Sequence, residues 1–351
     1  KTGRDADRLM LEAVGLLEDV SSAAEYAEKY VDVHPGLYLN ILENGKYTDI
    51  NDMVSMGMKA MQMIPKKYIM RSKVALKTAE YMIQTNEKQS LLEKCYFTAY
   101  ESDTSALNYL RALLNGYELK QKREELQQVF MTVSAQKSNN SIGVYERGNA
   151  YSERQENILY TNMELLLQFL NGQFADVLAN GLNISKALGW TGTFMKQGIA
   201  LYLLYLYEGQ WIDKGIIAMA GIVKEAMHFS AEAYQKGTCE SEDINENDLF
   251  CNVFIKWKSI VQMEPDVRTG AIKKITDLLA KRTEGIMSEN RRSYYGECAA
   301  YIAALGEVQE SLGEIGAKQR LMTSYKDKYS RRSAFREEMR RYGWKDVNKR
   351  K

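Results

Sequence analysis

The two histidines are the first side chains to examine for catalysis or metal binding, because the 351-residue chain has no others. His34 stands beside Pro35, and His228 is expected on an apolar helix face. Three histidine ligands are therefore impossible within this chain, and neither an H-E-x-x-H nor a G-x-S-x-G motif is present. We predict that both histidines are packed or surface residues without a catalytic role.

The four cysteines are the second set of reactive side chains. Cys95, Cys239, Cys251 and Cys298 form neither a C-x-x-C pair nor the spacing of a small disulfide framework. Cys95 and Cys298 lie among apolar residues at helical spacing, so we expect them to be buried free thiols in a reducing, cytoplasmic compartment. No metal site and no cofactor are predicted.

The sequence also lacks a complete nucleotide-binding or calcium-binding motif. Neither G-x-x-x-x-G-K-[ST] nor G-x-G-x-x-G occurs. The stretch that begins at Asp243 resembles the start of an EF-hand loop, but Asp248 stands where glycine is needed and Phe254 where a bidentate glutamate is needed. We therefore predict a solvated acidic loop there, and we expect the chain not to be an enzyme.

Aromatic side chains gather around one expected turn, at Tyr202, Tyr205, Tyr207 and Trp211. The first interpretation is that tyrosines fill gaps between packed helices, with their hydroxyl groups at the rim. The alternative is a ligand groove, because concave helical stacks often bind their partners on the inner face.

The C-terminal segment is strongly basic. From Lys318 onward there are 13 Lys or Arg against 4 Asp or Glu, a local net charge of +9, although the whole chain carries only +1. On a helix that starts at Ala334, Phe335 and Met339 share one face that should pack inward. The candidate partner-binding residues are the arginines outside that face: Arg331, Arg332, Arg336, Arg340 and Arg341. This segment is predicted to be either a solvated capping helix or a surface for an anionic partner.

The composition predicts an all-α fold. The chain has only three prolines, is rich in strong helix formers, and shows almost no period-two alternation of Val, Ile and Thr. Expected helices cover most of the chain, among them 66–84, 105–114, 211–233 and 316–329. The segment 32–36, which contains Pro35, is expected to interrupt the helices.

A leucine–glycine–aromatic pattern recurs at expected helix ends. It occurs around Gly45, Gly116, Gly172 and Gly209, with a weaker version at Gly313. Glycine there would take the left-handed conformation that ends a helix, and the aromatic ring would pack back between two helices. Three of the four separations lie near multiples of the ~34-residue tetratricopeptide period. We therefore predict an α-solenoid of tetratricopeptide-like helical hairpins, with a non-repetitive helical domain as the alternative.

The polar segment 136–151 has no apolar periodicity, so we expect it to be a linker or long loop. It would separate two groups of helical repeats, 1–135 and 152–351, and the second group would end in the basic helix. The longest apolar run, at 198–207, is half the ~20 residues that a bilayer requires, so no membrane span is expected.

Two stretches carry a family resemblance. The first combines Ile69–Leu76, Ala99–Thr104 and Asn108–Arg111, and the second combines 304–308, 316–318 and Arg331–Glu338. Together they resemble the helical C-terminal region of bacterial SWIM zinc-finger-type proteins and cover about a third of the chain. The C-x-C pair of that finger is absent, so the resemblance implies a helical interaction scaffold whose finger lies upstream of Lys1, in a longer protein, or has been lost.

These observations predict a non-enzymatic helical-repeat scaffold that mediates protein–protein interaction. The alternative is a nucleic-acid-associated module that uses the basic C-terminal face, and an enzyme without a recognisable motif comes third. A protein partner is expected, and nucleic acid is the second partner class.

Overall fold

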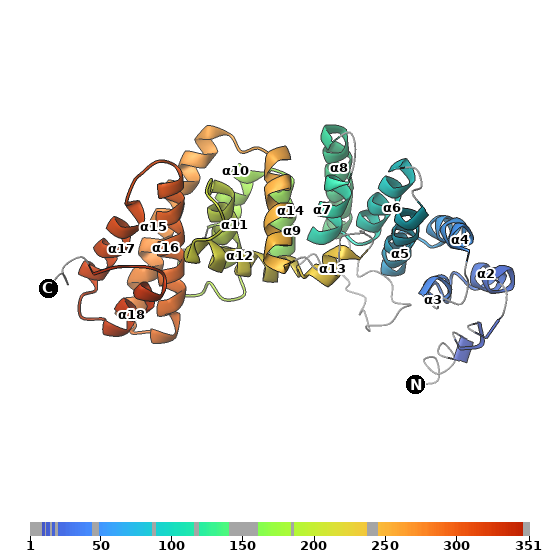
Figure 1. Ribbon diagram of the computed structural model, residues 1–351, viewed down its shortest axis with the longest axis horizontal. Helices are drawn as coiled ribbons and strands as arrows, with labels where there is room; N and C mark the ends of the chain where they lie inside the picture. Colours follow the sequence, from blue (N-terminus) through green and yellow to red (C-terminus); the bar gives the residue numbers. More distant parts are fainter. Residues whose placement is uncertain are drawn as a thin grey trace. The chain divides into compact units, whose positions relative to one another are not determined.

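The computed structural model of this protein is all-helical (Figure 1). It describes residues 9–10, 12–14, 16–17, 20–43, 49–85, 89–115, 119–139, 161–183, 186–236 and 245–346. No strand occurs in these ranges, which confirms the all-α prediction. Most of the predicted linker 136–151 lies outside the described residues.

The chain divides into two compact units, and the first contains residues 1–159 and 229–260. The segment 229–260 groups here with the N-terminal helices, whereas the sequence analysis placed it in the C-terminal group 152–351. The helices of the first unit are α2 (Val20–Lys29), α3 (Gly36–Glu43), α4 (Ile50–Met63), α5 (Ile69–Thr85), α6 (Gln89–Ser102), α7 (Ala106–Leu114), α8 (Leu119–Asn139), α13 (Ala231–Gln235) and α14 (Glu246–Ile260).

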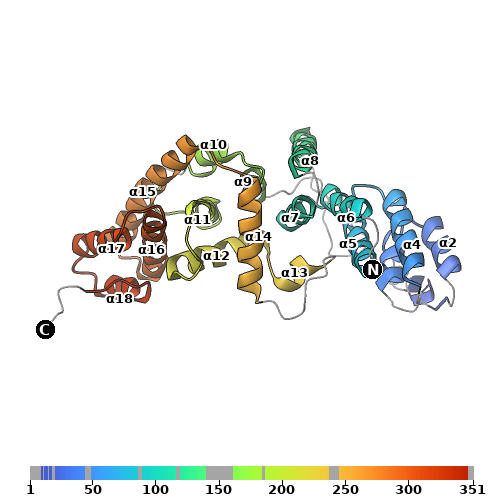
Figure 2. The ribbon, with the colours of Figure 1, turned by 45° about the horizontal axis from the view of Figure 1, so that its top comes forward.

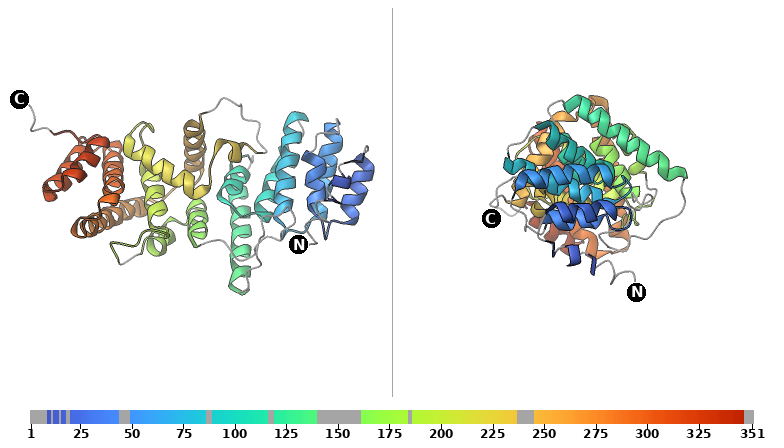
Figure 3. Two further views of the ribbon diagram at one scale, coloured as in Figure 1. Left: turned by 90° about the horizontal axis from the view of Figure 1, so that it is seen from below. Right: turned by 90° about the vertical axis from the view of Figure 1, so that its right-hand side faces the viewer.

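Helices of the first unit pack in chain order. Each helix from α4 to α7 contacts the next one along the chain (Figures 2 and 3). Helix α2 contacts α3 and α4, and α3 contacts α4 and α5. Arg111 on α7 attaches α13 to this series: its guanidinium donates to the carbonyl oxygens of Ala233 and Tyr234. Lys256 on α14 donates to the carbonyl oxygen of Leu114. These bonds explain why 229–260 belongs to the first unit.

The second unit contains residues 160–228 and 261–351. Its elements are α9 (Thr161–Leu170), α10 (Phe174–Asp176), the π-helix η1 (Val177–Gly181), α11 (Met195–Leu206), α12 (Lys214–Met227), α15 (Pro265–Ser288), the 3₁₀-helix η2 (Arg292–Tyr294), α16 (Tyr295–Ser311), α17 (Ala317–Lys328) and α18 (Ser333–Arg341).

Helix α16 is the centre of the second unit. It contacts α11, α12, α15, α17 and α18, and its residues from Cys298 to Val308 are all buried. Small residues allow this close packing: a Cβ added at Gly306 would lie 2.5 Å from the Lys318 Cα, and one at Gly215 would lie 2.4 Å from the Ala304 backbone nitrogen. Larger residues at either glycine would push a neighbouring helix away.

The predicted interruption at 32–36 is confirmed, because α2 ends at Lys29 and α3 begins at Gly36, directly after Pro35. One boundary differs from the sequence prediction. The helix expected over 211–233 is two helices: α12 ends at Met227, where His228 takes a left-handed conformation with φ 52°. Ser230 then caps α13 by accepting a hydrogen bond from the Ala233 amide.

The leucine–glycine–aromatic pattern predicted some helix ends correctly. Gly172 and Gly313 have φ of 83° and 102°, and the backbone hydrogen bonds around each close the preceding helix. Gly209 does not take the left-handed conformation, since α11 ends in extended backbone at Tyr207. Gly45 and Gly116 lie outside the described residues.

Candidate functional site

The two histidines belong to different units, His34 to the first and His228 to the second. The side chain of His228 is exposed at the end of α12, so its predicted place on an apolar helix face is wrong. Within the described ranges, no group of three or more His, Cys, Asp or Glu side chains is arranged to hold a metal ion. The segment that resembled an EF-hand is helical from Glu246 onward, which is incompatible with a calcium loop.

The cysteines that the structure describes are free thiols. Cys95 and Cys298 are buried, as predicted, and Cys251 is half-buried. Burial in apolar surroundings raises the pKa of Cys95 to about 12 and that of Cys298 to about 12. Neither thiol is therefore an activated nucleophile. Cys239 lies outside the described residues.

Native Cys95 and Cys298 should resist alkylation. At pH 8 each should react with iodoacetamide roughly 10³-fold more slowly than an ordinary thiol with a pKa of about 8.5, because almost no thiolate is present. Mass spectrometry of the labelled peptides measures each rate separately. Denaturant should restore labelling, and fast labelling of either residue in the native chain would contradict its burial.

The tyrosine cluster is packed between helices. Tyr202 and Tyr205 are buried, and their hydroxyl groups donate to the carbonyl oxygens of Phe174 and Val261. The Tyr207 hydroxyl donates to an Asp213 carboxylate oxygen at 2.7 Å. These bonds agree with the packing interpretation.

The basic C-terminal helix α18 packs as predicted on its apolar face. Phe335, Met339 and the following Trp344 are 0%, 0% and 4% exposed, and they join the core formed with α15, α16 and α17. The predicted inward packing of Phe335 and Met339 is confirmed.

The five arginines of this segment have different surroundings. Arg332 donates to the Met287 carbonyl oxygen and the Asn290 side chain, and so ties α18 to the end of α15. Arg340 and Arg341 pair with Glu337 and Glu338, three residues earlier on α18. Within the described part of the chain, Arg331 and Arg336 have neither an ion pair nor a side-chain hydrogen bond.

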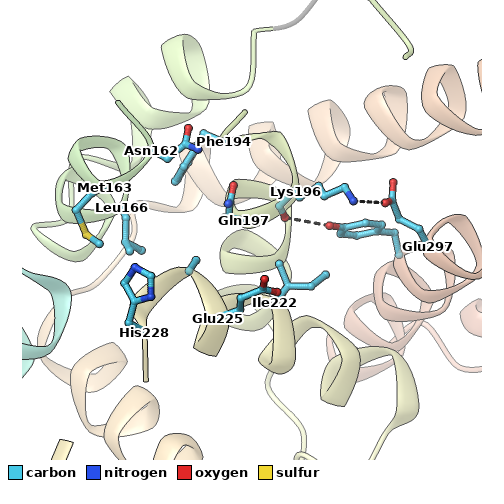
Figure 4. A pocket seen from close by; sticks show the side chains of 12 residues that line it. Asn162, Met163, Leu166, Phe194, Lys196, Gln197, Ile222, Glu225, His228 and Glu297 are labelled. Atoms are coloured by element: carbon cyan, nitrogen blue, oxygen red, sulfur yellow. Dashed lines mark hydrogen bonds and ion pairs between the residues drawn. The ribbon is translucent and has the colours of Figure 1, made fainter. Parts of the chain in front are cut away.

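A pocket of about 470 Å³ opens among α9, α11, α12 and α16 of the second unit (Figure 4). Met163, Leu166, Phe194 and Ile222 supply apolar walls. The polar lining residues are Asn162, Lys196, Gln197, Glu225, His228, Glu297 and Tyr301. Of these residues, only His228 stood out as a candidate in the sequence.

One end of this pocket is an ion-pair network centred on Glu297. Lys196 Nζ lies 2.5 Å from Glu297 Oε2, and Arg282 Nη2 lies 2.9 Å from Glu297 Oε1. The guanidinium of Arg282 is buried between the rings of Trp190 and Tyr294, at 4.9 Å and 5.1 Å from their centroids. Both carboxylate oxygens are therefore occupied, and this network fixes the walls of the pocket.

The residues that carried the family resemblance form helix-to-helix contacts. In the first unit, Arg71 donates to Glu101 and Ser102, and Asn108 connects Asp103 with Arg111. Burial raises the pKa of Glu101, but the hydrogen bonds and charges of Lys66 and Arg71 outweigh it, so this pKa is lowered. The acid is therefore held ionised as a structural group.

The second stretch of the resemblance also has a structural role. Glu307 on α16 is 1% exposed, and its carboxylate accepts hydrogen bonds from the Gly215 and Ile216 amides at the start of α12. Lys318 on α17 lies 2.6 Å from the same carboxylate. One side chain thus joins three helices.

Comparison with protein-family models, with curated proteins and with solved structures gives no match to this chain. None of the described helices is both long enough and apolar enough to cross a membrane.

Proposed function

We propose that this chain is a non-enzymatic helical-repeat scaffold, an α-solenoid of tetratricopeptide-like hairpins that binds a protein partner. The observation that carries the proposal is the chain-order packing of α4 to α8 in the first unit. Packing between sequence neighbours is typical of repeat stacks, which present extended surfaces to other proteins. The left-handed glycines at Gly172 and Gly313 support the same type of helix ending in the second unit.

Affinity capture followed by reconstitution tests this function. The immobilised chain is exposed to nuclease-treated cell lysate at about 0.15 M salt, and each retained protein is purified and titrated against the chain by calorimetry. The proposal expects a 1:1 or other fixed stoichiometry with a micromolar or tighter Kd. Absence of any protein that binds stoichiometrically after purification would overturn it.

The resemblance to bacterial SWIM zinc-finger-type proteins is part of this proposal, because it implies a helical scaffold next to a finger. The coding sequence upstream of Lys1 tests it. A C-x-C pair followed by a cysteine and a histidine would support the resemblance, and an upstream region without them would remove this support.

A second function, association with nucleic acid through α18, is favoured by one observation. Arg331 and Arg336 lack carboxylate partners in the described chain, so their charge is available to phosphate groups. Arg340 and Arg341 are already paired within the helix.

Replacing Arg331 and Arg336 with glutamate should abolish binding of a duplex oligonucleotide if this second function holds, since interactions with phosphate carry most of the affinity. Fluorescence anisotropy at several salt concentrations measures the effect. Each single variant removes one arginine–phosphate interaction and should therefore reduce the slope of log Kd against log salt by about 1. Replacing Arg340 and Arg341 is the matched control and should have a smaller effect. Wild-type chain that shows no salt-dependent binding would exclude the nucleic-acid function.

A further inference from the structure

The outward face of α12 is apolar in the middle and charged at both ends. Ile217 is 48% exposed and Gly221 is exposed, whereas Ala218 and Ile222 are half-buried. An exposed charged residue stands one turn before them, and another stands one turn after them. Spacings of three and four residues place all six on one side of the helix. We call this set the α12 face: Lys214, Ile217, Ala218, Gly221, Ile222 and Glu225.

Nothing in the described chain covers the middle of the α12 face. A Cβ atom added at Gly221 would meet no other atom within 4 Å, apart from the neighbouring backbone of its own helix. Gly215, on the buried side of α12, differs, because a Cβ atom there would lie 2.4 Å from the Ala304 backbone nitrogen. One side of α12 is therefore packed against α16, and the α12 face has room for a further helix.

The apolar part of the α12 face is complementary to itself in the antiparallel direction. When two copies of α12 cross about a two-fold axis between Ala218 and Gly221, Ala218 of each copy faces Gly221 of the other. These small residues allow the two helix axes to approach to about 8 Å. Ile217 of each copy then packs against Ile222 of the second copy, on either side of the crossing. Apolar surface that is exposed in the single chain is buried in the pair.

The charges at the two ends of the α12 face follow the same symmetry. Lys214 and Glu225 are equally far from the two-fold axis along the helix, so each Lys214 is brought beside Glu225 of the second copy. Lys214 Nζ donates to the Arg341 carbonyl oxygen at 3.0 Å, which uses one of its three N–H groups. Glu225 has neither an ion pair nor a side-chain hydrogen bond within the described residues. An antiparallel pair therefore forms two ion pairs, whereas a parallel pair would place like charges together.

The pocket of the second unit adds to this contact. Ile222 belongs both to the α12 face and to the lining of the pocket, where it lies near Glu225 (Figure 4). Ile217 of the second copy faces Ile222 and is thereby brought to the edge of the pocket. The apolar walls, which include Leu166 and Phe194, can receive this side chain, and a volume of about 470 Å³ is ample for it.

We propose that the α12 face is the contact between two copies of this chain, which associate through an antiparallel, two-fold pairing of α12. The order of charges and side-chain sizes identifies a second copy as the occupant, because it is complementary to itself when read in reverse. One pair of helices buries less than the roughly 1,200 Å² of a stable interface, so the Kd should be on the order of 10–100 μM. The proposal does not depend on the scaffold function.

Sedimentation equilibrium of the full chain tests the association. At loadings from about 1 to 500 μM, the weight-average mass should rise from that of one chain toward that of two chains. It should not rise beyond two chains, because a two-fold contact is closed and leaves no second α12 face for a third copy.

Charge reversal tests the antiparallel direction. Lys214→Glu and Glu225→Lys should each raise the Kd roughly tenfold, because each replaces two attractive pairs with two repulsive ones. The double variant restores opposite charges across the axis and should associate within about threefold of the wild type. Both changes suit the helix, since acids are favourable in its first turn and bases in its last turn. Asp277→Lys, at an exposed position of α15, is the matched control and should leave the Kd unchanged.

Gly221→Gln tests the close approach of the two helices. The single chain has room for the new side chain, so the fold should persist. The side chain would hold the two copies apart, and the Kd should rise at least about tenfold. Gly270→Gln on α15 is the matched control: this glycine is also exposed, and a Cβ atom there would meet only Leu178, at 4.0 Å.

Three results would overturn the proposal. They are a wild-type mass that stays at one chain at every loading, a Gly221→Gln chain that associates like the wild type, and a double charge variant that associates no better than the single variants. Circular dichroism verifies that each variant is folded. The charge variants and the glycine variant are independent readouts, so either folded set is sufficient for the decision.

Discussion

Replacing Glu307 with alanine should lower the free energy of unfolding of the second unit by about 3–5 kcal/mol, the cost of breaking a buried ion pair from one side. Two consequences add to this cost. The Gly215 and Ile216 amides, both buried, lose the acceptor that now lies 3.1 Å and 2.8 Å away. The Lys318 ammonium, whose side chain is 13% exposed, loses its carboxylate. Urea denaturation, followed by fluorescence, measures the change.

The control for this prediction is a double substitution. Glu307→Gln keeps an acceptor for one amide but leaves Lys318 without a counter-charge, so it should remain destabilising. Adding Lys318→Met removes that isolated charge and should recover most of the loss, because a buried pair replaced on both sides is often nearly neutral. A cost below about 1 kcal/mol for Glu307→Ala would show that α12, α16 and α17 do not depend on this side chain.

Sequence analysis predicts best where the signal is local. The burial of Phe335 and Met339 was predicted because residues four apart share one face of a helix, and a single turn contains the whole pattern. The left-handed glycines at Gly172 and Gly313 were predicted for the same reason, since the helix end and its glycine are adjacent in sequence. His228 shows the limit: the capping serine at position 230 was the available signal for the end of α12 and was overlooked.

The polar contacts between helices could not be predicted from one sequence. Glu307 stands in an apolar run, and from the sequence alone it would be taken for a solvated charge. Its buried position results from the packing of α12 and α17 on α16. The pocket is more difficult still, because Asn162, Gln197 and Glu225 come from three helices and acquire a common environment only after folding. The absence of a partner for a buried oxygen is a property of the packed structure and leaves no mark in the sequence.

The last hairpin of the second unit should depend on a single aromatic side chain. Phe335 is 0% exposed, and its ring packs edge to face against Tyr295 and Tyr329, with centroid distances of 5.7 Å and 6.2 Å. Phe335→Ala should cost about 3–5 kcal/mol, because it removes this packing and leaves a cavity between α16 and α18. Phe335→Leu retains most of the volume and should cost less than about 1.5 kcal/mol.

Amide hydrogen exchange can locate the stability that Phe335→Ala loses, because it reports on each helix separately. Because α18 packs on α16 and α17 and ends the described helices, its amides should exchange faster in Phe335→Ala by a factor that corresponds to the loss of stability, up to about 10²–10³. Replacing Arg331 and Arg336 with glutamate should leave the same amides protected, since Arg331 is exposed, Arg336 is half-buried and neither has an ion pair in the described chain. This contrast separates the two faces of one helix: the apolar face holds the end of the unit together, and the basic face remains available to a partner. Unchanged exchange in Phe335→Ala would mean that Met339, Trp344 and the Arg332 hydrogen bonds to α15 suffice to hold α18 in place.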